Sequence, residues 1–250
     1  MGFSLRQFSE ILKRRDAAGD PYLLVGGQAV NYWAERCLQV EPELAKLQPF
    51  TGEDIDFKGN REVIERIARQ LGRFPAYPHK VEMTALAGVI PLQLDELKWS
   101  LEVVRRIPGI SGTVAPPTVR AQGQGMTIRV LDSISLLASE LDLAATLSQE
   151  RRRDVPHLKI LVPCVRALLG ELLERVELHD IAARDWLNAA NQVVKLTSGR
   201  RGRRIGSRHR LKRKEILPLA SIGRTQQRQI RRFQERQLGR GNRKSKGMSV

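Results

Sequence analysis

The sequence predicts an α+β fold in three consecutive parts, and three observations support this division. Up to about residue 130, short apolar runs with the two-residue period of strands alternate with helical segments. From residue 131 the apolar residues follow the spacing of helices, and from residue 198 large apolar residues become scarce while Arg and Lys dominate. We therefore expect an α/β core over residues 1–130, a C-terminal helical annex over 131–197 and a basic, disordered tail over 198–250.

The net charge of the chain is concentrated in the expected tail. The 250 residues carry a formal charge of +16, and residues 200–250 alone hold 18 basic side chains against Glu215 and Glu235. The rest of the chain is therefore neutral overall. Because this tail contains a single aromatic residue, Phe233, it is suited to salt-sensitive contacts with RNA phosphates more than to base stacking. A solvated tail without a function is the alternative explanation.

The sequence is that expected of a cytoplasmic protein. The two cysteines, Cys37 and Cys164, lie in apolar helical segments, which excludes a disulfide framework and favours a reducing compartment. No apolar run approaches the roughly 20 residues that a membrane span requires. The first residues lack the basic segment and apolar block of a secretory signal. We expect no membrane partner.

The core elements follow from apolar spacing and from residues that cap helices or form turns. Gly19-Asp20-Pro21 ends a first amphipathic helix, and Asn60 is a suitable N-cap for a later one. Residues 81–94 and 98–107 should pair antiparallel through a turn near Asp95-Glu96. The expected helices cover 4–18, 28–36 and 60–71, the expected strands cover 22–25, 53–57, 81–94, 98–107 and 126–130, and 108–124 is expected to be irregular.

Beyond the core, three helices are expected in the annex, one capped by Asp132 and two over 154–173 and 177–195. In the tail, only residues 225–238 are expected to become helical, and only on binding. Ile230 and Phe233 would then lie on one side of that basic helix.

Asp54 and Asp56 lie on one face of the expected strand 53–57, because side chains on a strand alternate between faces. Ile55 and Phe57 then point into the core. Two carboxylates roughly 6–7 Å apart on one face repel each other unless they are solvated or bind a cation. Magnesium suits such a pair, since it takes a few carboxylates and completes its shell with water and substrate phosphates. A surface pair of acids is the alternative explanation.

Two further features accompany the aspartates. Gly26-Gly27 lies between the expected strand 22–25 and helix 28–36, where bare backbone N–H groups and the positive end of the helix dipole can hold an anion. A tight turn without a ligand would use the same residues. Glu102 lies between apolar residues in the strand 98–107, so its side chain faces either solvent or the same pocket as the aspartates.

The order of these features resembles the DNA polymerase β-type nucleotidyltransferase superfamily, and within it the small bacterial AbiEii-like proteins. The resemblance rests on Val25-Gly26-Gly27-Gln28-Ala29-Val30 and Thr51-Gly52-Glu53-Asp54-Ile55-Asp56-Phe57, with support from Leu101-Glu102-Val103-Val104 and Ile107-Pro108-Gly109. It covers residues 20 to 110. Two features depart from the family pattern: the third acid is Glu102 where aspartate is usual, and no serine directly follows the glycine pair.

The resemblance implies a mixed nucleotidyltransferase-type sheet with flanking helices and a nucleoside triphosphate in its cleft. The residues implied to bind the nucleotide are Gly26, Gly27 and Gln28. The residues implied to be catalytic and to bind magnesium (Mg2+) are Asp54, Asp56 and Glu102. In the family, the acid at the position of Glu102 positions or deprotonates the attacking hydroxyl.

The expected function is magnesium-dependent transfer of a nucleoside monophosphate from a nucleoside triphosphate to a hydroxyl on RNA or protein. The alternative is a catalytically weak protein that binds nucleotide or RNA within a toxin–antitoxin or phage-defence system. Its partner would then be a cognate antitoxin protein.

Arg152 and His157 show the R-x4-H spacing found in some metal-independent ribonucleases that partner nucleotidyltransferases. Pro156 interrupts the pattern, and a match in an arginine-rich stretch arises easily by chance. We interpret His157 as a surface residue at the start of a helix.

Overall fold

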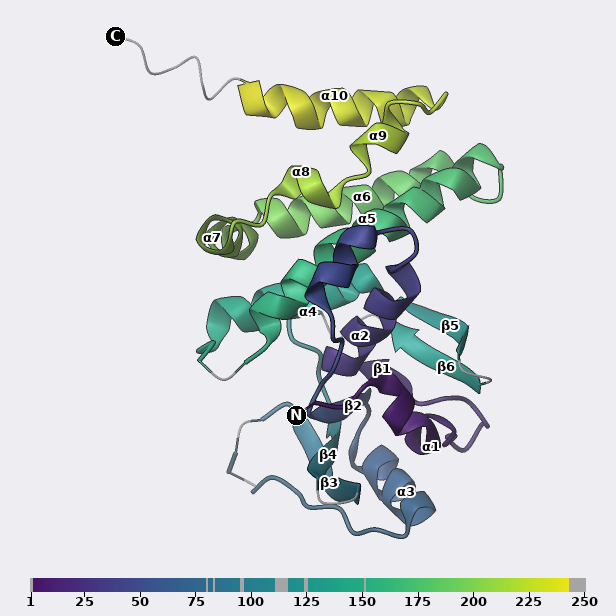
Figure 1. Ribbon diagram of the computed structural model, residues 1–250, viewed down its shortest axis with the longest axis vertical. Helices are drawn as coiled ribbons and strands as arrows, with labels where there is room; N and C mark the ends of the chain where they lie inside the picture. The colour runs from purple at the N-terminus through teal and green to yellow at the C-terminus, as the bar shows by residue number, and fades with distance from the viewer. Residues whose placement is uncertain are drawn as a thin grey trace. The chain divides into compact units, whose positions relative to one another are not determined.

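The structure is a computed structural model that describes residues 2–79, 81–82, 84–94, 97–110, 117–123, 126–150 and 152–242 (Figure 1). The chain forms two compact units, Met1–Leu161 and Val162–Val250. The boundary falls inside helix α5 (Asp154–Glu177), well beyond the expected boundary at residue 130. The first unit is longer than expected because α4 (Ser133–Thr146) packs against α2 (Gly26–Cys37).

The first unit is built on a mixed sheet of six strands, in the order β3-β4-β2-β1-β6-β5. The strands are β1 (Leu23–Val25), β2 (Asp54–Lys58), β3 (Leu86–Leu94), β4 (Leu97–Val104), β5 (Thr118–Gly123) and β6 (Met126–Leu131). β2 runs antiparallel to β1 and parallel to β4, while β1 runs parallel to β6. This sheet with its flanking helices confirms the predicted α+β class.

The helices of the first unit follow the predicted order. They are η1 (Leu5–Phe8), α1 (Ser9–Leu12), α2, η2 (Pro42–Leu47), α3 (Arg61–Leu71), α4 and the first turns of α5. As predicted, the side chains of Asn60 and Asp132 cap α3 and α4, since each accepts a hydrogen bond from a backbone N–H of the first turn. The first helical segment ends at Leu12, earlier than expected, because Arg15 pairs with Pro21 as an isolated bridge.

One strand was not predicted from the sequence. β5 lies within the stretch that was expected to be irregular, and it pairs antiparallel with β6 at one edge of the sheet (Figure 1). Its residues lack a regular alternation of large apolar side chains, and of those whose burial is described Thr118 and Val119 are half-buried and Arg120 is exposed, so the strand depends on backbone pairing with β6. β3 and β4 are antiparallel neighbours, as predicted, although Asp95 and Glu96 at the expected turn lie outside the described residues.

In the second unit, the expected disordered tail is folded up to residue 242. The helices that follow α5 are α6 (Ala183–Ser198), α7 (Arg200–His209), α8 (Arg213–Ile216), α9 (Leu219–Ile222) and α10 (Arg228–Asn242). The prediction of disorder over this range is wrong because most of its few large apolar side chains are spaced so that they are buried. These buried residues are Ile205, Ile216, Leu217, Ile222, Ile230 and Phe233.

No helix in the described ranges has the length and apolarity needed to cross a membrane.

α10 packs through the two residues that were expected to share one side of a helix. Ile230 and Phe233 are 0% and 1% exposed, and the ring of Phe233 meets Trp186 of α6 edge to face with centroids 5.5 Å apart. Aromatic pairs of this geometry add to the free energy gained from burial.

Replacing Phe233 with Ala should therefore lower the free energy of unfolding by about 3–5 kcal/mol, the usual range for a buried phenylalanine. Urea denaturation measures this loss, and trypsin should cleave the variant rapidly after the arginines of α10. Arg232→Ala, on the exposed side of the same helix, is the control and should change stability by less than about 0.5 kcal/mol. Equal stability of both variants would mean that α10 does not pack against α6 through Phe233.

Candidate active site

The two aspartates of β2 point to one face of the sheet, as predicted. Ile55 and Phe57, which alternate with them, are 0% and 1% exposed, while Asp54 and Asp56 are only partly buried. The burial of the alternating apolar residues fixes the register of β2, since a shift by one residue would place both carboxylates in the core.

Glu102 reaches the same face through the pairing of β2 with β4. In this parallel pair Asp56 lies beside Glu102, and Asp54 lies beside Ser100. Paired residues on neighbouring strands direct their side chains to the same side. Asp54, Asp56 and Glu102 all line one cavity of about 350 Å3. Of the two orientations left open by the sequence, the side chain of Glu102 therefore faces the pocket of the aspartates.

Gly26 and Gly27 line this cavity at the start of α2. Gly26 has φ +63°, and a Cβ there would lie 2.8 Å from Cγ of Asp56, so only glycine allows the backbone to approach the carboxylate this closely. A Cβ at Gly27 would lie 3.0 Å from Cε1 of His157. The corner thus places the N-terminus of a helix of 12 residues directly beside the acids.

Gln28 does not belong to the described lining of the cavity. Its side chain is 0% exposed, Nε2 donates to the carbonyl of Phe3 at 3.0 Å, and Oε1 accepts from Asn31 at 3.2 Å. The side chain of Gln28 is thus engaged within the protein, and a role of this residue in binding nucleotide stays a prediction. Gln28 ties α2 to the N-terminal segment, because a buried amide needs partners within the protein.

The carboxylates of the cavity raise one another's pKa values. Burial raises the pKa of Asp56 well above its usual value, and the charges of Asp54, Glu102 and Glu140 raise it further. Asp56 is surrounded by protein atoms but is not fully buried. We attribute its accessible surface to the cavity that it lines. Burial also raises the pKa values of Asp54 and Glu102. The group therefore favours bound protons or a cation.

This arrangement predicts how the stability of the metal-free protein depends on pH. A carboxyl group whose pKa is raised by folding contributes stability below its unfolded pKa of about 4, and that contribution is lost as pH rises through the folded value. Thermal unfolding with a chelator should therefore show a lower melting temperature at about pH 8 than at about pH 5. The difference in melting temperature between the two pH values should be smaller in Asp56→Asn. An unchanged difference would mean that the carboxyl group of Asp56 does not cause it.

The residues just before α5 and its first turn contribute basic side chains to the same cavity. Arg152 binds Asp154 through two hydrogen bonds of 2.7 and 3.0 Å, and Arg153 donates to the carbonyl of Thr51 at 2.6 Å. Arg152, Arg153 and His157 all line the cavity.

His157 is not the surface residue that the sequence suggested. Its side chain is 12% exposed, and Nδ1 lies 3.4 Å from Oε2 of Glu140. Arg152, the other member of the R-x4-H spacing, is engaged by Asp154. No local sequence signal places His157 here, because its partner Glu140 comes from α4, and this contact depends on the packing of the two helices.

The donor set of the cavity fits magnesium. Among the described residues, no group of three or more His, Cys, Asp and Glu side chains is arranged so that it could hold a metal ion. Magnesium needs fewer protein ligands, since one or two carboxylates, water and substrate phosphates complete its shell. Asp54 and Asp56 would supply such a pair, and the mutual repulsion of the carboxylates favours a divalent cation. Glu102 is not supported as a third ligand in a preformed cluster.

Comparisons with known proteins add little to this geometry. No family model and no curated protein matches the chain. A solved structure, the crystal structure of JHP933 from Helicobacter pylori, aligns over 96% of both chains with 15% sequence identity and a TM-score of 0.38. Because this similarity is low, the function is inferred from the site itself.

Proposed function

We propose that the protein is a magnesium-dependent nucleotidyltransferase that moves a nucleoside monophosphate from a nucleoside triphosphate to a hydroxyl acceptor on RNA or protein in the cytoplasm. The observation that carries this proposal is the meeting of Asp54, Asp56 and Glu102 with Gly26 and Gly27 in one cavity. The resemblance to the DNA polymerase β-type superfamily, and to its AbiEii-like members, rests on these same residues.

The glycine corner is the proposed site for the phosphates. Backbone N–H groups at the start of α2 have no partners within the helix, and the dipole of the helix favours negative charge there. Asp54 and Asp56 would hold magnesium beside these phosphates, where the ion supplies charge neutralisation during phosphoryl transfer. The aspartates and the glycine corner thereby orient the α-phosphate toward Glu102.

Glu102 is the proposed base for the acceptor hydroxyl. Burial and the charge of Asp54 raise the pKa of Glu102, which makes it a better proton acceptor than an exposed glutamate. As the hydroxyl proton moves to Glu102, the hydroxyl oxygen bonds to the α-phosphorus. The bond from that phosphorus to the bridging oxygen of the β-phosphate breaks, and its electron pair leaves with pyrophosphate.

The test uses nucleoside triphosphates labelled at the α-phosphate, magnesium and total cellular RNA. We expect label to appear in RNA or in the protein itself, and Asp54→Asn to remove it. Glu62→Gln, an exposed acid on α3 outside the described lining of the cavity, is the control and should transfer normally. Full transfer by Asp54→Asn would refute the proposal.

Two departures from the family pattern favour a second candidate, a protein that binds nucleotide or RNA with little turnover. Glu102 replaces the usual aspartate, and no serine follows Gly26-Gly27. Such a protein would act within a toxin–antitoxin or phage-defence pair and bind a cognate antitoxin. Retention of nucleotide or RNA without transfer in the same assay would support this candidate.

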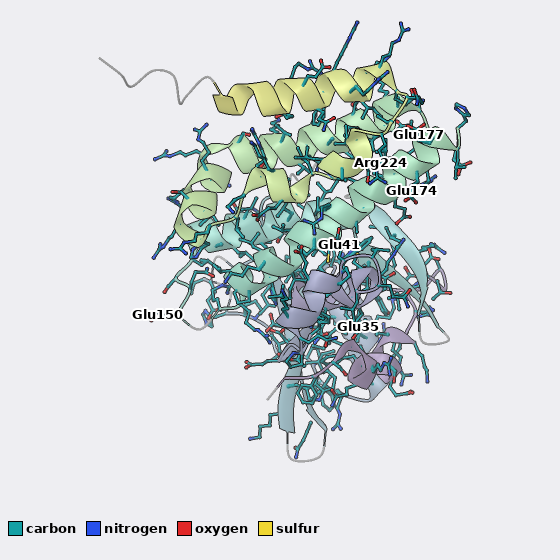
Figure 2. The ribbon with its side chains drawn as sticks, turned by 45° about the horizontal axis from the view of Figure 1, so that its top comes forward. Glu35, Glu41, Glu150, Glu174, Glu177 and Arg224 are labelled. Carbon is teal, nitrogen blue, oxygen red and sulfur yellow. The ribbon has the colours of Figure 1, made fainter. Side chains whose placement is uncertain are left out.

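RNA is the proposed macromolecular partner, bound through the basic helices after residue 198. Figure 2 shows nitrogen-tipped side chains extending outward from α10. Exposed arginines occur at helical spacing on both α7 and α10, namely Arg200, Arg203, Arg204 and Arg208, and Arg228, Arg231, Arg232 and Arg236. Such stripes match a phosphate backbone, so retention of RNA should fall steeply as salt rises.

A further inference from the structure

Glu140 and His157 form a pair of side chains at the wall of the cavity. Neither residue belongs to the proposed magnesium site or acts as the proposed base. Glu140 is 3% exposed, and its Oε2 has no hydrogen-bond partner of good geometry among the described residues. Nδ1 of His157 lies 3.4 Å from this oxygen, which is an electrostatic contact longer than a good hydrogen bond. Burial raises the pKa of Glu140, and the neighbouring imidazole offsets part of that rise.

The other edge of the imidazole faces the glycine corner. A Cβ at Gly27 would lie 3.0 Å from Cε1 and 3.5 Å from Nε2 of His157, so this edge lies over the backbone at the start of α2. The ring is therefore held on one side by a buried carboxylate and presents Nε2 on the other. A carboxylate at one nitrogen of a histidine fixes the ring and leaves the second nitrogen for a ligand.

We propose that Glu140 orients His157 so that Nε2–H donates to the phosphates that leave as pyrophosphate. This inference rests on the proposed nucleotide transfer and assigns a group to its departing side. When the bond between the α-phosphorus and the bridging oxygen breaks, the electron pair remains on that oxygen. Doubly protonated His157 gives it the Nε2 proton and keeps the Nδ1 proton that faces Glu140, pyrophosphate departs protonated, and the neutral imidazole regains a proton from solvent.

The two members of the R-x4-H spacing have different carboxylate partners. The Arg152 guanidinium makes two hydrogen bonds to Asp154, which is 4% exposed, so Arg152 is engaged by a buried partner. His157 works with Glu140 instead. In this role Glu140 is a positioning residue, because it acts only through the histidine.

A first test measures phosphate binding directly. Inorganic tripolyphosphate with magnesium is titrated into the full chain by calorimetry. We expect His157→Gln to raise the dissociation constant about tenfold, which corresponds to the loss of one hydrogen bond to a charged group. Glu140→Gln should raise it less. His79→Gln, an exposed histidine outside the described lining of the cavity, should bind like the unaltered chain.

A second test varies the leaving group. Transfer rates are compared for a nucleoside triphosphate and its β,γ-difluoromethylene and β,γ-methylene analogues, whose departing groups are respectively less and more basic. His157→Gln should slow transfer from the methylene analogue on the order of 10²-fold, with a smaller loss for the difluoromethylene analogue. Glu140→Gln should show the same trend, whereas Asp54→Asn should abolish transfer from all three substrates. Thermal unfolding checks that each variant is folded.

The outcomes separate this inference from the proposed function. If the unaltered chain transfers nucleotide and His157→Gln does so at the same rate, or is slowed equally with all three substrates, the inference is overturned and the proposed function stands. If the unaltered chain transfers nothing, the proposed function and the leaving-group role both fail. Weaker tripolyphosphate binding by His157→Gln would then support only the phosphate contact.

Discussion

Replacing Asp56 with Asn is expected to abolish nucleotide transfer and, at the same time, to stabilise the metal-free protein. Asp56 is the central acid of the cavity, since it lies beside Glu102 in the sheet and its carboxylate is crowded by Asp54 and Glu140. Transfer should fall on the order of 10³-fold or more, because a proposed ligand of the ion that would neutralise phosphate charge is lost. Stability should rise by about 1–2 kcal/mol, as is common when a functional site is relieved of repulsion.

The two effects are measured on the same protein sample. Transfer is followed with labelled nucleotide, and the free energy of unfolding is taken from urea denaturation in the presence of a chelator near neutral pH. Added magnesium should stabilise the unaltered chain but not Asp56→Asn. Glu62→Gln on the surface of α3 serves as the matched control, for which neither quantity should change appreciably. A destabilised Asp56→Asn protein would show that the carboxylate has a structural role instead.

Gly26→Ala is expected to have the largest effect of any glycine substitution at the site. The backbone at Gly26 has φ +63°, which for alanine costs about 1–2 kcal/mol. In addition, the new Cβ would lie 2.8 Å from Cγ of Asp56, a clash that either displaces the carboxylate or shifts α2. Overpacking of this kind costs about 1–3 kcal/mol more. We expect a total loss of about 2–5 kcal/mol, together with loss of magnesium-dependent stabilisation.

Gly72 offers a control with nearly the same backbone geometry. Gly72 ends α3 with φ +61°, and no described atom lies within 4 Å of the position that a Cβ would take. Gly72→Ala should therefore lose only the backbone contribution of about 1–2 kcal/mol and should keep its response to magnesium. If the two alanine variants unfold at the same urea concentration, a clash with Asp56 does not contribute to the loss of stability in Gly26→Ala.

Much of the candidate site could be predicted from local sequence patterns. The alternation of Asp54, Ile55, Asp56 and Phe57 predicts which side chains share a face, because a strand has a strict two-residue period. The position of Gly26 between a strand and a helix likewise predicts a backbone corner. For Glu102 the pattern left two faces open, and the parallel pairing of β4 with β2 decided between them.

Other features depended on contacts between residues distant in the chain. The pairing of His157 with Glu140 joins the start of one helix to the middle of another, and neither residue belongs to a periodic pattern that distinguishes it from a surface residue. The amide of Gln28 is used within the protein because Phe3 supplies a partner. In the second unit, composition suggested disorder, yet most of the few large apolar residues are buried, among them Phe233 beside Trp186.

By itself, the sequence determined the α+β class, the face on which the two aspartates lie, and the glycine corner, since these follow from periods and turns within a few neighbouring residues. Only the tertiary structure decided that Glu102 joins the aspartates, that His157 faces the glycines, and that residues 200–242 fold into helices. The physical reason is that burial and charge pairing depend on which elements pack together, and a local pattern does not specify its distant neighbours.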